Sequence, residues 1–70
     1  MKYYEIYVNY GHGGYSLAVK SNRSLTEQEI ENKLIELDLL QEKFDINNIE
    51  YINEEDESLE EFFVDITLID

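Results

Sequence analysis

Hydrophobic and polar residues alternate along the first third of the chain. Every second residue from Tyr4 to Tyr10 is aromatic or aliphatic, and residues 15–21 alternate in the same way. Period-two alternation rich in tyrosine and β-branched residues is typical of β-strands. The run Gly11-His12-Gly13-Gly14 interrupts the pattern and favours a turn. The sequence therefore predicts an antiparallel β-hairpin over residues 3–21.

A helical periodicity follows the hairpin. Ile30, Leu34 and Leu37 recur at spacings of four and three residues, which is the spacing of a buried stripe on a helix. Residues 24–27, with the sequence Ser-Leu-Thr-Glu, match a capping box, in which a serine oxygen accepts from an early backbone N–H. A helix is therefore predicted over residues 25–40.

The C-terminal part contains two further stretches with strand character. Residues 45–48 are typical of a turn, and residues 49–52 predict a short strand. The acidic run at 54–57 is too highly charged to pack and is predicted to be a loop. A second capping-box pattern at 58–61 predicts a helical turn. Residues 62–68 then alternate again and predict a final strand.

These elements follow the order strand, strand, helix, strand, strand. The order predicts an α+β fold with a β-hairpin, one main helix and one or two further strands, the helix packing on one face of a mostly antiparallel sheet. Seventy residues are expected to form a single domain, 1–70. The residues predicted to form the core are Ile6, Val8, Leu34, Leu37, Val64 and Ile66.

The strongly negative charge of the chain is unusual for a domain of this size. Seventeen acidic residues face five basic ones, which gives a formal net charge of −12. No lysine or arginine follows Lys43, whereas the acids continue to Asp70. Nucleic acids and anionic lipids are themselves negative, so we expect neither as a direct partner. A basic protein surface is the expected partner.

The chain has no cysteine, which excludes disulfides and thiolate metal sites. No apolar run approaches the roughly 20 residues that span a bilayer. The N-terminus begins directly with a strand pattern and has no features of a signal peptide. We therefore expect a cytoplasmic protein without membrane association.

Candidates for catalysis or metal binding are few. His12 is the single histidine and has no nucleophile paired with it in the sequence pattern, so we expect an exposed or structural turn residue. The turn around it lacks the spacing and the lysine of a phosphate-binding loop. The run at 54–57 is either a solvated acidic loop or a weak, non-specific cation site, since its spacing differs from that of a helix–loop–helix calcium site. We predict no enzymatic activity, catalytic residue, cofactor or dedicated metal.

Two tyrosines are the strongest candidates for apolar contact with a partner. If Ile6 and Val8 face the helix, Tyr3 and Tyr7 lie with Glu5 on the opposite face of the sheet, which a single helix cannot cover. Tyrosine is a frequent interface anchor because it buries a large area at little entropic cost. The alternative is a tyrosine cluster that packs only on its cross-strand neighbours.

In size, acidity and lack of cysteine, and above all in residues 54–57 with Glu60 and Glu61, the chain resembles small acidic proteins of phages and other mobile elements. Among these are antirestriction and anti-CRISPR proteins that imitate nucleic acid. The resemblance implies a non-catalytic inhibitor, acting in the host cytoplasm, that occupies the nucleic-acid-binding surface of a host defence protein. The alternative is a small homodimeric accessory module whose charge serves solubility. The expected partner-binding residues are Glu54, Glu55, Asp56, Glu57, Glu60, Glu61, Tyr3 and Tyr7.

Overall fold

The computed structural model describes residues 1–56 and 59–70. The elements along this described part of the chain are β1 (Lys2–Asn9), β2 (Gly14–Ser21), α1 (Glu27–Glu36), α2 (Glu42–Asn47), β3 (Ile49–Glu55) and β4 (Thr67–Leu68).

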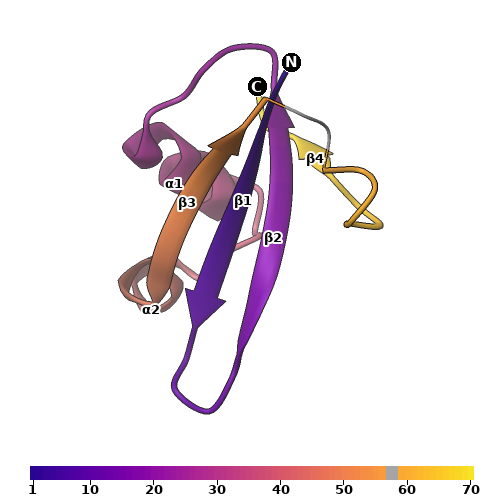
Figure 1. Ribbon diagram of the computed structural model, residues 1–70. Helices are drawn as coiled ribbons and strands as arrows, with labels where there is room; N and C mark the ends of the chain where they lie inside the picture. Colours follow the sequence, from indigo (N-terminus) through magenta and orange to yellow (C-terminus); the bar gives the residue numbers. More distant parts are fainter. Residues whose placement is uncertain (57–58) are drawn as a thin grey trace.

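The four strands form one sheet in the order β3-β1-β2-β4. β1 pairs antiparallel with both β2 and β3, while the short β4 pairs parallel with β2. In Figure 1 the helix α1 lies behind the three long strands, so one face of the sheet is covered and the other faces the viewer. The predicted α+β fold, with an N-terminal hairpin and a helix on one face of a mostly antiparallel sheet, is confirmed.

The covered face of the sheet holds the core. Tyr4, Ile6 and Val8 of β1 are almost fully buried and cluster with Ile30 and Leu34 of α1. The burial predicted for Ile6, Val8 and Leu34 is therefore confirmed. Each of these side chains is 0% exposed, so the alternation along β1 and the helical stripe point at one another.

The helix α1 is shorter than predicted at both ends. Its N-cap is Thr26, which forms the capping box with Glu29, and the predicted box at residues 24–27 is wrong by two residues. Leu25 is instead buried in the core, where its backbone N–H donates to the Tyr4 hydroxyl at 2.8 Å. The helix therefore begins at Glu27, two residues after the buried Leu25.

The C-terminal end of α1 reverses before the predicted residue 40. Asp38 adopts a left-handed conformation with φ 60°, and the N–H groups of Leu39 and Leu40 both donate to the Leu34 carbonyl. This turn returns Leu40 to the core, where it is 3% exposed. Leu37 lies at the turn and is 44% exposed, so its predicted burial is wrong.

A second helix, α2, occupies part of the segment that was predicted to be a turn. The Asp45 carboxylate accepts from the Gln41 N–H at 2.6 Å, and the Asp45 N–H donates to the Gln41 carbonyl at 3.0 Å. This reciprocal pair closes the first turn of α2. The strand β3 follows at Ile49 and runs through Glu54 to Glu55, so the predicted loop over these two acids is wrong. Residues 57 and 58 lie outside the described part of the chain.

The last strand is far shorter than predicted, and the predicted burial of Val64 is wrong. β4 contains only Thr67 and Leu68, Val64 is fully exposed and Ile66 is half-buried, whereas Ile69 is 3% exposed in the core. Continuing the register Val19↔Thr67 backwards would set Asp65 opposite Leu17, which packs against the core. Burying an unpaired carboxylate there is costly, and this explains why the pairing stops.

The segment before β4 forms a helical turn in place of the strand. The N–H groups of Phe62 and Phe63 both donate to the Leu59 carbonyl, at 2.9 and 3.1 Å. The helical turn predicted near residues 58–61 thus begins at Leu59, while Ser58, the residue expected to cap it, lies outside the described residues.

A candidate protein-binding face on the open side of the sheet

The face of the sheet away from α1 carries the side chains that alternate with the core residues. We call this the open face. The register places Tyr3 between Lys20 and Glu55, and Tyr7 between Ser16 and Tyr51. The open face combines aromatic rings with carboxylates, and no helix in the described part of the chain lies over it in Figure 1.

Two tyrosines from neighbouring strands stack at the centre of the open face. The rings of Tyr7 and Tyr51 lie 5.6 Å apart between centroids, with an interplanar angle of 12°. The Tyr51 hydroxyl donates to the Glu5 carboxylate at 3.5 Å. Desolvation and the negative charge of Glu5 raise the pKa of Tyr51, while a hydrogen bond with Ser16 acts in the opposite direction. Tyr51 therefore remains protonated and neutral at physiological pH.

The close packing of Tyr7 depends on a glycine. A Cβ atom at Gly14 would lie 2.5 Å from the Tyr7 hydroxyl oxygen and 2.6 Å from the Val8 carbonyl oxygen. Real Cβ atoms do not approach other atoms so closely, so Tyr7 can keep this position only beside a glycine. The missing side chain at the first residue of β2 thus leaves the space that Tyr7 occupies in the stack.

The arrangement suits recognition of a cation. The face of a tyrosine ring attracts lysine and arginine side chains, and the Glu5 carboxylate beside it accepts their hydrogen bonds. Glu55 adds a second carboxylate opposite Tyr3 at the end of β3. Within the described residues neither Glu5 nor Glu55 forms an ion pair. Their negative charges are therefore not neutralised by any lysine or arginine side chain that the structure describes.

The acids at the end of β3 do not form one cluster. Glu54 lies on the covered side of the sheet, where its carboxylate accepts from the Tyr4 hydroxyl at 3.2 Å and contacts Lys2 at 3.5 Å. Asp56 also binds Lys2, at 2.7 Å, and this hydrogen bond with its charge lowers the pKa of Asp56. The same bond raises the pKa of Lys2.

The remaining predicted acids lie beyond the end of β3. Glu60 contacts Lys20 of β2 at 3.4 Å, and Glu61 is exposed. Glu57 lies outside the described residues. Of the predicted partner-binding residues, the structure brings Tyr3, Tyr7 and Glu55 onto the open face, and it pairs Glu54, Asp56 and Glu60 with lysines from the N-terminal half.

One aromatic residue of the open face was not placed there from the sequence. Tyr51 falls in the segment predicted as a short strand, whereas Glu5 was expected on this face with Tyr3 and Tyr7 but not among the partner-binding residues. A strand over residues 49–52 places Tyr51 and Ile52 on opposite faces of the sheet. Only the pairing Tyr7↔Tyr51 shows that this tyrosine stacks on the hairpin.

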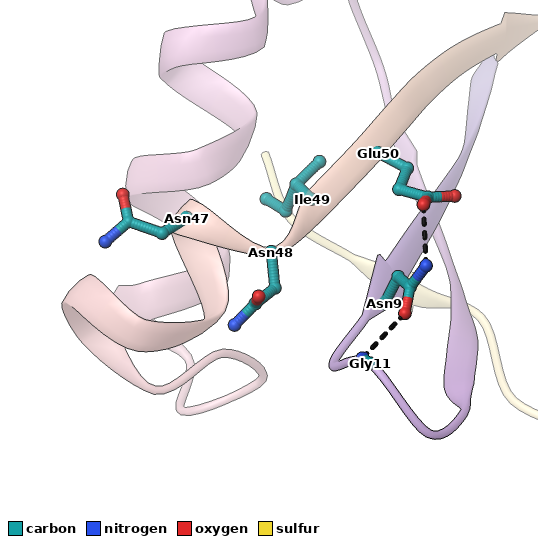
Figure 2. Close-up of a pocket in the computed structure, with 6 residues that line it drawn as sticks. All are labelled: Asn9, Gly11, Asn47, Asn48, Ile49 and Glu50. Carbon is teal, nitrogen blue, oxygen red and sulfur yellow. Dashed lines mark hydrogen bonds between the residues drawn. The ribbon is translucent and has the colours of Figure 1, made fainter.

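A polar depression of about 330 Å³ lies at the other end of the molecule, where the hairpin turn approaches the junction of α2 and β3. Figure 2 shows the Asn9 side chain pointing toward Glu50, to which its amide donates at 2.6 Å. The Asn9 side-chain oxygen accepts from the Gly11 N–H at 2.9 Å, and the Asn9 N–H donates to the Asn48 carbonyl. The polar groups at this end therefore join three segments of the chain.

His12 is exposed in the hairpin turn, as expected for a turn residue. Across residues 1–56 and 59–70, no group of three or more histidine, aspartate or glutamate side chains is arranged to hold a metal ion. No helix in these residues is long and apolar enough to cross a membrane.

Comparison of the chain with protein-family models, with curated proteins and with solved structures finds no match.

Proposed function

We propose that this protein is a non-catalytic binding module whose open face docks on a basic protein surface that normally binds nucleic acid. The proposal rests on one observation, the Tyr7–Tyr51 stack beside Glu5 on a sheet face that no described helix covers. By occupying that surface, the protein acts as an inhibitor of the antirestriction or anti-CRISPR type.

The physical basis is charge complementarity supported by aromatic contact. Proteins that bind duplex DNA meet its phosphates, one per about 1.7 Å of axis, with lysine and arginine. A protein of net charge −12 is attracted to such a surface over long range, which speeds association. The tyrosine rings then supply desolvated contact area and cation–π attraction for individual basic side chains.

The binding test uses variants with equal charge. Glu5→Gln with Glu55→Gln removes two negative charges from the open face, and Glu27→Gln with Glu31→Gln removes two from α1. A synthetic arginine-rich peptide serves as the probe, and binding is followed through tyrosine fluorescence. We expect the first pair to weaken binding several-fold and the second pair to have little effect. Equal weakening by both pairs would show that net charge alone drives binding.

The competition test uses the protein's own target. The immobilised protein captures basic proteins from a bacterial lysate, and duplex DNA is then added to the purified complex. We expect DNA to displace the protein and increasing salt to weaken the complex. If the captured protein binds DNA and this protein simultaneously without loss of affinity for either, inhibition by mimicry is refuted.

A further inference from the structure

The strand β2 has a free edge over most of its length. On the side away from β1, only Val19 and Lys20 are paired, with β4, and no described strand pairs with residues 14–17 there. The Lys20 carbonyl accepts from Ile69 on this side at 2.9 Å. Since backbone groups of alternate residues point to the same edge, Gly14 and Ser16 direct their N–H and C=O groups to it as well.

This edge also lacks the charges that usually protect edge strands. Free strand edges are commonly blocked by charged side chains because they otherwise pair with another chain. β3, the edge strand on the opposite side of the sheet, carries Glu50, Glu54 and Glu55. By contrast, residues 6–19 contain no aspartate, glutamate, lysine or arginine, although 22 of the 70 residues are of these types.

We propose that β2 of a second copy of this chain pairs with this edge in antiparallel orientation, about a two-fold axis at Tyr15. A second copy fits because the uncharged stretch brings no like charges together, and because an antiparallel strand pair about a two-fold axis is self-complementary. Gly14 of each copy then exchanges backbone hydrogen bonds with Ser16 of the other. The result is one continuous sheet.

This dimer places both open faces on the same side of the extended sheet. Ser16 is the neighbour of Tyr7 in the register, so the two aromatic stacks flank the axis. With neighbouring strands about 4.8 Å apart, the two copies of β1 lie about 14 Å from one another. The paired area is small, so the dimer is weak and forms at high protein concentration.

The dimer and a complex with a basic partner should respond to salt in opposite directions. Two molecules of charge −12 repel one another, so screening by salt strengthens the dimer. The same salt weakens a complex with a basic surface. Failure of the dimer would therefore leave the proposed function standing, and failure of partner binding would leave the dimer standing.

The test introduces a positive or a negative charge at the exposed Ser16, and the exposed Asn53 on β3 is the matched control site. Sedimentation equilibrium up to about 1 mM protein should show a monomer–dimer equilibrium for the wild type, and the dimer fraction should increase between about 0.05 and 0.5 M salt. Ser16→Lys and Ser16→Glu should each be monomeric, because like charges meet near the axis, and an equimolar mixture should dimerise. Asn53→Lys should behave as the wild type.

A measurement on the unaltered protein makes the test independent of the variants' folding. Amide exchange of Gly14 and Ser16 should become slower as the protein concentration increases, while that of exposed β3 amides should not change. A wild type that stays monomeric to about 1 mM in high salt would overturn the proposal. So would an Asn53→Lys variant that loses the dimer while Ser16→Lys keeps it.

Discussion

The Tyr4 hydroxyl connects three parts of the fold, and its removal gives the sharpest test of the structure. The oxygen accepts from the buried N–H of Leu25 at 2.8 Å and donates to the Glu54 carboxylate at 3.2 Å. Tyr4→Phe keeps the ring, which is 2% exposed, and therefore leaves the packing of the core intact. Its principal effect is to leave the Leu25 N–H without an acceptor.

A buried donor that loses its partner costs about 1–3 kcal/mol. A 70-residue domain has a total stability of about 4–10 kcal/mol at 0.05–0.15 kcal/mol per residue, so Tyr4→Phe should remove a large part of it. In urea unfolding we expect a lower midpoint with an unchanged slope, and in thermal unfolding a decrease of at least about 4 °C. Tyr51→Phe is the control, because its hydroxyl lies at the surface, and it should change the midpoint little. Equal midpoints for Tyr4→Phe and the wild type would refute the role of this hydroxyl.

Two further predictions concern the core and pH. Leu34→Ala should cost about 2–5 kcal/mol in urea unfolding because Leu34 is fully buried, whereas Leu37→Ala, at 44% exposure, should cost much less; equal losses would contradict the placement of α1. The hydrogen bond and charge of Lys2 lower the pKa of Asp56, so this carboxylate stabilises the fold above its ordinary pKa of 3.8, and the contribution is lost as the pH falls through the lower folded value. Between pH 5 and 2.5 the wild type should therefore lose more stability than Asp56→Asn, and parallel pH curves for the two proteins would exclude this contribution.

The elements predicted correctly from the sequence are those whose pattern is local. The hairpin follows from alternation along β1 and β2 with glycines between them, and α1 follows from the spacing of Ile30 and Leu34. In both cases the residues that define the pattern are the ones that the core buries. Local periodicity was sufficient here because one side of each element meets the core and the other does not.

The errors occur where a distant residue decides the outcome. The faces of β4 are set by the pairing of Thr67 with the buried Val19, which turns Ile69 inward. Val64 lies before β4, outside the pairing, and is exposed. A shift of one residue exchanges the two faces of a strand, and alternation alone does not fix that choice. The start of α1 was similarly displaced because the Tyr4 hydroxyl, 21 residues away, binds the Leu25 N–H.

The candidate site was predicted in part for the same reason. The placement of Tyr3 and Tyr7 on one face required only the period of a strand, whereas the stack with Tyr51 required the register between β1 and β3. No lysine or arginine follows Lys43 in the sequence, so the local pattern did not indicate a base beside the acidic segment. In the fold, β1 and β2 bring Lys2 and Lys20 to its acids.

These ion pairs divide the acids into two groups with different roles. Glu54 and Asp56 both form ion pairs with Lys2. Removing their charges would leave that lysine unpaired, and would therefore change the stability of the fold as well as the electrostatic field around it. Glu5 and Glu55 lie beside the tyrosines and form no ion pair among the described residues, so their charges are available to the partner that we propose. Replacing all the acids near the end of β3 at once would mix these two effects. Binding measured for open-face variants, with the unfolding free energy measured on the same proteins, separates them, because an open-face carboxylate should change the affinity while leaving the urea midpoint nearly constant.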